Sequence, residues 1–135
     1  MKQVLSFLVV LNLIWLGATL PAMSAELAKE KVLMVFLFDP ECQITCDKVR
    51  PAVRELKDQY SKSVSYVEID SSDAASKVSK ELADKNRILW FYNDNLKFVP
   101  VVGFFTPAGK CLKYLTGAKS KSVYTSALKK AMATK

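Results

Sequence analysis

The stretch FDPECQITCDKVRP, residues 38–51, places Cys42 and Cys46 four positions apart, directly after an apolar run. Asp39 and Pro40 precede the pair, and Pro51 follows Cys46 by five positions. Two cysteines at this spacing can form a redox-active dithiol, a soft metal site or a structural disulfide. The segments on either side of the stretch help to choose among these three uses.

The cysteine pair separates two patterns of different period. The run KVLMVFLF, residues 31–38, is short and continuous, which predicts a strand buried on both faces of a sheet. From Cys46 onward, apolar residues recur at spacings of three and four, which predicts an amphipathic helix. Its apolar positions are Val49, Ala52, Val53, Leu56 and Tyr60. Because Pro51 has no N–H to donate, we expect a kink or a broken hydrogen bond in this helix.

The middle of the chain predicts a second strand and a second helix. Residues 63–70, SVSYVEID, are rich in β-branched and aromatic residues, as strands are. Residues 71–85 predict a helix that begins near Ser71, Ser72 or Asp73 and has Ala74, Val78 and Leu82 on one face. Residues 86–95, NRILWFYNDN, either extend that helix or form a separate aromatic turn.

The last third predicts a hairpin and a closing helix. Two apolar runs, residues 98–105 and 111–117, are separated by TPAGK, which favours antiparallel strands. Pro100 should stand at the start of its strand, because proline cannot donate to a sheet ladder. A final helix over residues 120–135 is expected to bury Val123, Ala127, Leu128 and Ala131.

This order of elements predicts one α/β domain with a mixed central sheet and helices on both faces. The first strand and its helix belong to a parallel pair, and the hairpin adds antiparallel strands. The two cysteines then lie at the carboxyl end of the first strand, where α/β proteins place their chemistry.

The N-terminal segment predicts export. Residues 1–20 carry a single charge, Lys2, ahead of a long apolar run, and PAMSAE follows. This order is typical of a secretory signal peptide, so we expect residues 1–25 to be a signal and residues 26–135 the exported domain, in a periplasm, a lumen or the extracellular space. The alternative is an uncleaved membrane anchor, for which the apolar run is at the short limit. Disulfides persist outside the cytosol.

Charge is distributed unevenly. The formal net charge is +7, and the segment from Asn95 to the end holds eight lysines and no acid. This basic third could dock an acidic partner or an anionic membrane surface, or it could be a solvated face. It has no arginine, which together with export argues against nucleic acid binding. We expect a monomer.

These features together resemble the thioredoxin family over nearly the whole exported part. An apolar strand delivers two cysteines to a helix N-terminus, and Pro51 stands where that family has a helix-kinking proline. FVPVV, residues 98–102, resembles its strand-opening cis-proline segment, and the PAGK hairpin leads to a strand that ends in YLTG. The resemblance implies a thioredoxin-like fold.

Three departures from the family pattern bear on activity. The family's dithiol is usually Cys-x-x-Cys behind a tryptophan, whereas here it is Cys-x-x-x-Cys behind Glu41, and we expect the extra residue in a loop between the cysteines. The apolar strand lacks the family's buried acid, which puts efficient reduction in doubt. The segment between Asp70 and Pro100 is long, with RILWFYNDN, residues 87–95, as the expected insertion.

The resemblance implies roles for individual residues. Cys42 would be the attacking thiol, stabilised as a thiolate by the helix N-terminus, and Cys46 the resolving thiol. Pro100 would be a cis-proline opposite them, and the backbone of Val99 would pair with a substrate strand. The implied activity is thiol–disulfide exchange on protein substrates, with a separate redox partner and no cofactor beyond a Cys42–Cys46 disulfide. The direction of exchange stays open.

The cysteine pair has two alternative uses. A structural disulfide in a non-catalytic binding or assembly module is possible, because residues four apart on a helix lie within disulfide range. A Cu(I) site needs a third ligand, and the chain has no histidine, which leaves only Met34 or Met132. We therefore expect no metal. The lack of histidine also excludes Cys–His protease chemistry.

Cys111 follows the hairpin turn. A strand from residue 100 to residue 106 is about 20 Å long, so Cys111 should lie at the end of the sheet away from the dithiol. It is expected to be a buried strand cysteine, or else a site of intermolecular disulfide formation or modification.

Overall fold

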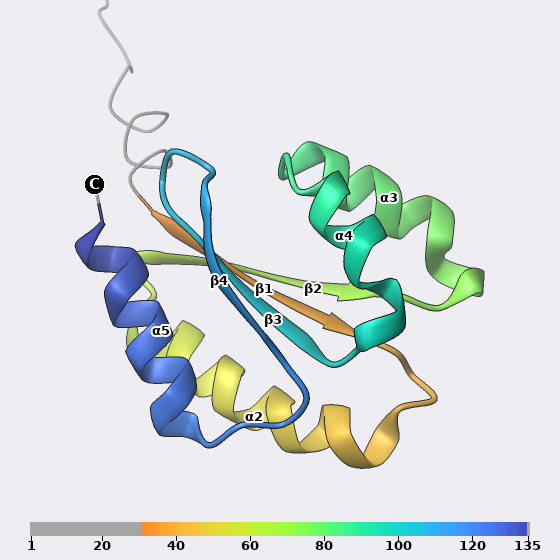
Figure 1. Cartoon of the computed structure of the whole chain (residues 1–135), viewed down its shortest axis with the longest axis horizontal. Coiled ribbons are helices and arrows are strands. Elements are labelled where there is room, and N and C mark those ends of the chain that lie inside the picture. The colour runs from red at the N-terminus through yellow and green to blue at the C-terminus, as the bar shows by residue number, and fades with distance from the viewer. Residues whose placement is uncertain (1–30, 135) are drawn as a thin grey trace, which may run out of the picture.

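A four-stranded mixed sheet organises the chain (Figure 1). The structure is a computed structural model that describes residues 31–134, so the predicted signal segment, residues 1–25, lies outside the described residues. The strands are β1 (Val32–Phe38), β2 (Val64–Asp70), β3 (Val101–Phe105) and β4 (Cys111–Thr116). The helices are α2 (Gln43–Gln59), α3 (Ser76–Lys85), α4 (Leu89–Asn95) and α5 (Lys121–Ala133).

The strand order is β2-β1-β3-β4. β1 pairs with β2 in parallel and with β3 antiparallel, and β3 pairs antiparallel with β4. The predicted mixed sheet, with one crossover and one hairpin, is therefore confirmed. β1 is a central strand whose side chains are buried on both faces of the sheet, which explains why its sequence is apolar without interruption.

Two helices cover each face of the sheet (Figure 1). Side chains alternate along β1, as the two-residue period of a strand requires. Met34 and Phe36 pack with residues of α2 and α5, whereas Val35 and Leu37 pack with residues of α3 and α4. The sheet thus separates two apolar cores, and the first of them contains Cys46.

Residues 86–95 do not extend α3, so the first of the two predicted alternatives was wrong: a turn leads into the separate helix α4, Leu89–Asn95. Arg87 has φ +60°, a left-handed conformation that a helix cannot continue through. The chain therefore turns between α3 and α4. The helix α4 brings Phe91 and Tyr92 into the core, while Trp90 stays half exposed.

Two predictions of the inward faces of helices were wrong. In α3, Val78 is 69% exposed, and the small residues Ser79 and Ala83 face the core instead. Ser79 lies beside the hydroxyl of Tyr92 from α4, so the bulk that fills this layer comes from the neighbouring helix. In α5, Tyr124 is buried in place of Val123.

The burial of Tyr124 has a clear physical basis. Its hydroxyl accepts a hydrogen bond from the N–H of Lys119 at 3.0 Å and donates one to the carbonyl of Gly117 at 3.2 Å. A buried tyrosine needs such partners for its hydroxyl.

Within residues 31–134, no helix is long and apolar enough to span a bilayer.

Candidate active site around Cys42 and Cys46

The turn between β1 and α2 sets the position of Cys42. The side chain of Asp39 accepts a hydrogen bond from the N–H of Glu41 at 2.8 Å, and its carbonyl accepts one from the N–H of Cys42 at 3.0 Å. Cys42 is the N-cap residue of α2, and no side chain caps this end of the helix. Its first N–H groups are therefore left to stabilise an anion such as a thiolate.

The three residues between the cysteines belong to the helix. α2 begins at Gln43, so the prediction that the extra residue lies in a loop was wrong. The N–H of Cys46 donates to the carbonyl of Cys42 at 3.0 Å, which is the regular bond of an α-helical turn. Cys-x-x-x-Cys is thus one turn of helix. Residues at this spacing have Cα atoms about 6 Å apart, which a disulfide can bridge.

The two thiols differ in exposure. Cys42 is half-buried, whereas Cys46 is 1% exposed and packs in the core between the sheet, α2 and α5. Burial raises the pKa of the Cys46 thiol to about 11, and the neighbouring Cys42 acts in the same direction. The backbone of Asp39 and the charge of Arg50 work against this rise.

The predicted kinking proline lies inside α2, and the helix continues through it to Gln59. Pro51 is exposed. Because it has no N–H, the carbonyl of Asp47 one turn earlier has no helical donor at this position.

Val99 and Pro100 lie at the end of the sheet from which the cysteine turn departs. Their peptide bond is cis. The register pairs Leu37 of β1 with Val101 of β3, so Pro100 stands next to the end of β1 from which the cysteine turn departs. The carbonyl of Pro100 accepts a hydrogen bond from the N–H of Gly117 at 2.8 Å. Within residues 31–134, no hydrogen bond to another backbone group uses Val99.

Two exposed apolar side chains accompany this site and were not predicted. Ile44, in the first turn of α2, is 78% exposed, and Phe98, just ahead of Val99, is 59% exposed. An isoleucine inside the polar stretch ECQITC was the signal for the first. Exposed apolar side chains near a reactive group suit contact with another chain.

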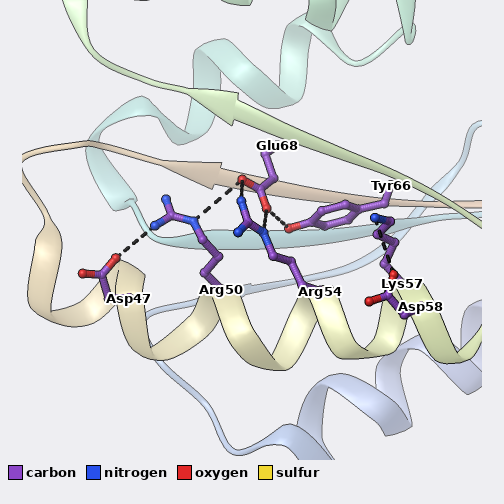
Figure 2. Close-up of polar contacts among 7 residues, drawn as sticks. All are labelled: Asp47, Arg50, Arg54, Lys57, Asp58, Tyr66 and Glu68. Atoms are coloured by element: carbon purple, nitrogen blue, oxygen red, sulfur yellow. Dashed lines mark hydrogen bonds and ion pairs between the residues drawn. The ribbon is translucent and has the colours of Figure 1, made fainter.

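An ionic network on the α2 side of the sheet was also missed (Figure 2). Glu68 of β2 receives two hydrogen bonds from Arg54, at 2.7 and 3.0 Å, and one from the hydroxyl of Tyr66 at 2.8 Å. Arg50 reaches the same carboxylate with its Nε at 3.7 Å. The carboxylate nearest to Arg50 on the sheet thus comes from β2, the strand beside β1.

The network sets the protonation of its members. Burial works to raise the pKa of Glu68, but the hydrogen bonds from Arg54 and Tyr66 and the charges of both arginines hold it below its ordinary value of 4.5. Burial, with the contact to Glu68, raises the pKa of Tyr66 above its ordinary range. At neutral pH, Glu68 is thus an anion beside a neutral phenol.

The other residues considered from the sequence are Cys111 and the possible metal ligands, and none of them adds to the site at Cys42 and Cys46. Cys111 pairs with Phe105, and Phe105 pairs with Leu33 near the start of β1, so the prediction that Cys111 lies at the far end of the sheet is confirmed. Met34 is fully buried in the core. In the described part of the chain, no three His, Cys, Asp or Glu side chains are grouped so that they could hold a metal ion.

A mixed sheet with a cysteine pair at the helix that follows its central strand, next to a cis-proline, defines a protein of the thioredoxin-fold class. The sequence matches the thioredoxin-like domain family over residues 22–132. The chain belongs to the thioredoxin-like family.

Solved structures agree on the fold. The chain is similar to the thioredoxin of Malassezia sympodialis (Mala s 13), with a TM-score of 0.54 and 17% identity over 81% of this chain and 84% of that one. It is also similar to MTB dsbF, with a TM-score of 0.56 and 18% identity over 76% and 81% of the two chains. A thioredoxin-like protein in its oxidized form gives a TM-score of 0.56 and 19% identity over 77% and 79%. Among curated proteins, none matches the sequence.

Proposed function

We propose that this protein is an exported thiol–disulfide oxidoreductase that acts on protein disulfides through Cys42 and Cys46. The observation that carries the proposal is the unequal burial of two thiols one helical turn apart. Cys42 is half-buried at the helix N-terminus, and Cys46 is buried behind it. An accessible thiol can attack a substrate, and an inaccessible one can react only with its neighbour.

The proposed reaction moves two electrons between protein dithiol and substrate disulfide. The thiolate of Cys42 attacks one substrate sulfur, which forms a mixed disulfide and releases the other substrate sulfur as a thiolate that takes up a proton. Cys46 loses its proton and attacks the sulfur of Cys42. The Cys42–Cys46 disulfide forms, and the second substrate thiol leaves. Run in reverse, the same steps oxidise a substrate dithiol, and a separate redox partner restores the starting state.

The surroundings of the pair suit an extended peptide as substrate. The backbone of Val99 forms no hydrogen bond to another backbone group of residues 31–134, so it can pair with a substrate strand beside Pro100. Ile44 and Phe98 offer exposed apolar surface on the two segments that bear Cys42 and Val99. This arrangement favours cysteines flanked by apolar residues in partly unfolded chains.

Activity towards a protein disulfide tests the proposal. We expect the purified protein to catalyse reduction of insulin by dithiothreitol, Cys42→Ser to abolish this activity, and Cys46→Ser to accumulate a mixed disulfide detectable by mass spectrometry. Cys111→Ser is the matched control, because Cys111 lies at the far end of the sheet, and it should retain the activity.

A glutathione redox titration of the Cys42–Cys46 pair separates the proposal from its rival, a binding module with a structural disulfide. An active pair should equilibrate between about −270 and −120 mV. A potential below about −300 mV, together with no insulin reduction, would assign the pair to structure rather than catalysis.

A further inference from the structure

Arg50 lies one helical turn beyond Cys46, on the same face of α2. Its side chain is only 25% exposed. The guanidinium carbon lies 4.8 Å from the ring centroid of Phe38 and 5.7 Å from that of Phe36. These two rings belong to the end of β1 that leads into the cysteine turn, so they hold the cation close to the dithiol.

The polar contacts of Arg50 leave its Nε without a hydrogen-bond partner. Its Nη1 donates to the exposed carboxylate of Asp47 at 2.9 Å. Its Nε is buried and has no hydrogen-bond partner, and it faces Glu68 across 3.7 Å. Both oxygens of Glu68 already accept hydrogen bonds from Arg54 or Tyr66 (Figure 2).

The ionisable groups around Cys46 belong to α2, β2 and the turn before α2, apart from the phenol of Tyr124 on α5. On α2 they are Cys42, Asp47, Arg50 and Arg54, and on β2 the ionisable groups are Tyr66 and Glu68. The turn adds Asp39 and Glu41. The parts of β1, β3 and α5 that share the core with Cys46 contribute apolar side chains and the hydrogen-bonded phenol of Tyr124. Arg50 is the cation whose charge acts on the Cys46 thiol.

We propose that Arg50 promotes the resolving step by stabilising the thiolate of Cys46, and that Glu68 is a positioning residue that holds Arg50 and moderates its charge. This inference rests on the proposed exchange reaction. A buried thiol resists ionisation, yet it must lose its proton to attack the mixed disulfide on Cys42. A half-buried cation one turn away lowers the cost of that ionisation, in a protein whose β1 offers no acid to receive the proton.

The first test titrates the Cys46 thiol by the ultraviolet absorbance of the thiolate in a Cys42→Ser/Cys111→Ser background, which leaves Cys46 as the one cysteine of the three. We expect Arg50→Gln to raise the pKa of Cys46, Glu68→Gln to lower it, and Arg50→Lys, which keeps the charge, to stay closer to the parent protein. Arg54→Gln is the matched control. It breaks the shorter contacts with Glu68 but lies two turns from Cys46, so it should cost more stability and change the titration less.

The second test measures how fast a preformed mixed disulfide between Cys42 and a model peptide is resolved. Each unit of pKa rise lowers the thiolate fraction tenfold at neutral pH, and the higher nucleophilicity of the more basic thiolate offsets part of this loss. We therefore expect Arg50→Gln to slow resolution by about threefold per unit. The rate at which Cys42 attacks a disulfide should change less.

The inference is overturned if Arg50→Gln and Arg54→Gln change the Cys46 titration equally, or if neither changes it. The titration needs no turnover, so it is independent of the proposed function. If no protein disulfide is reduced while the titration responds as expected, the proposed function fails and the electrostatic role of Arg50 stands.

Discussion

Gly103 is the position where the aromatic residues of α4 meet the sheet. A Cβ atom at this residue would lie 2.8 Å from the ring of Phe91 and 2.9 Å from that of Phe105. These two rings pack edge to face, with centroids 5.3 Å apart. The absence of a side chain at Gly103 is thus what lets Phe91 reach β3, and it couples α4 to the central sheet.

We expect Gly103→Ala to destabilise the protein by about 1 to 3 kcal/mol, because both rings are buried and cannot move aside without repacking the core. Urea unfolding would measure the change. Gly103→Ala combined with Phe91→Leu should recover part of the loss, since it removes the ring that the new methyl group meets. Equal stability of Gly103→Ala and the parent protein would show that the rings move freely.

At the scale of elements, the turn between α3 and α4 depends on Arg87. Its φ of +60° costs a non-glycine residue roughly 1 kcal/mol. The N–H of Arg87 donates to the carbonyl of Asp84 at 2.8 Å, and that of Ile88 donates to Ala83 at 2.9 Å. These bonds close α3 and direct α4 back over the sheet.

Arg87→Gly should therefore raise the free energy of unfolding by up to about 1 kcal/mol, because glycine adopts this conformation without strain. Thermal unfolding compares it with Arg87→Ala, which keeps the strain and should match the parent protein within about 0.5 kcal/mol. A stabilisation of the alanine variant equal to that of the glycine variant would assign the effect to the lost charge.

Periodicity in the sequence predicted the strands, the hairpin and the approximate extent of the helices, because these depend on neighbours close in the chain. It also predicted that the cysteines lie at the carboxyl end of β1, because they stand in the sequence between the residues of this strand and those of the helix that follows it. The inner faces of α3 and α5 were misjudged because hydropathy ranks Val78 and Val123 above Ser79 and Tyr124. Tertiary partners, such as the two hydrogen bonds of the Tyr124 hydroxyl, decide burial there.

The network around Glu68 could not be read from the sequence for a different reason. Arg54 and Glu68 are 14 positions apart, and they meet only because α2 packs against the sheet in a position that places Arg54 next to Glu68 of β2. No local pattern marks such a pair. Arg50 follows Cys46 by one helical turn and is visible in the sequence, whereas the carboxylate of Glu68 that faces it comes from β2 and is placed only by the packing of the helix on the sheet.

The whole molecule should be most stable between an acidic and an alkaline pH limit, to which Glu68 and Cys46 contribute. Glu68 has a pKa below its ordinary 4.5 in the folded state, so its contribution is present above that value and is lost as the pH falls through the folded pKa. Cys46 has a pKa raised from 9.0 to about 11. Its contribution is complete below pH 9 and is lost as the pH rises towards the folded value.

We expect the ionisation of Cys46 to cost the reduced protein about 2 kcal/mol of stability between pH 9 and pH 11, since each unit of pKa shift corresponds to about 1.4 kcal/mol and part of the shift takes effect outside this range. Urea unfolding at several pH values would measure this loss. Cys46→Ala should reduce the alkaline loss and leave the acidic side unchanged; the loss that remains comes from the tyrosines whose pKa burial also raises, Tyr66 among them. Glu68→Gln should flatten the acidic side by removing the carboxylate that accepts hydrogen bonds from Arg54 and Tyr66. The two variants thus report separately on the two ionisations. An alkaline loss of the same size in Cys46→Ala would mean that groups other than this thiol control it.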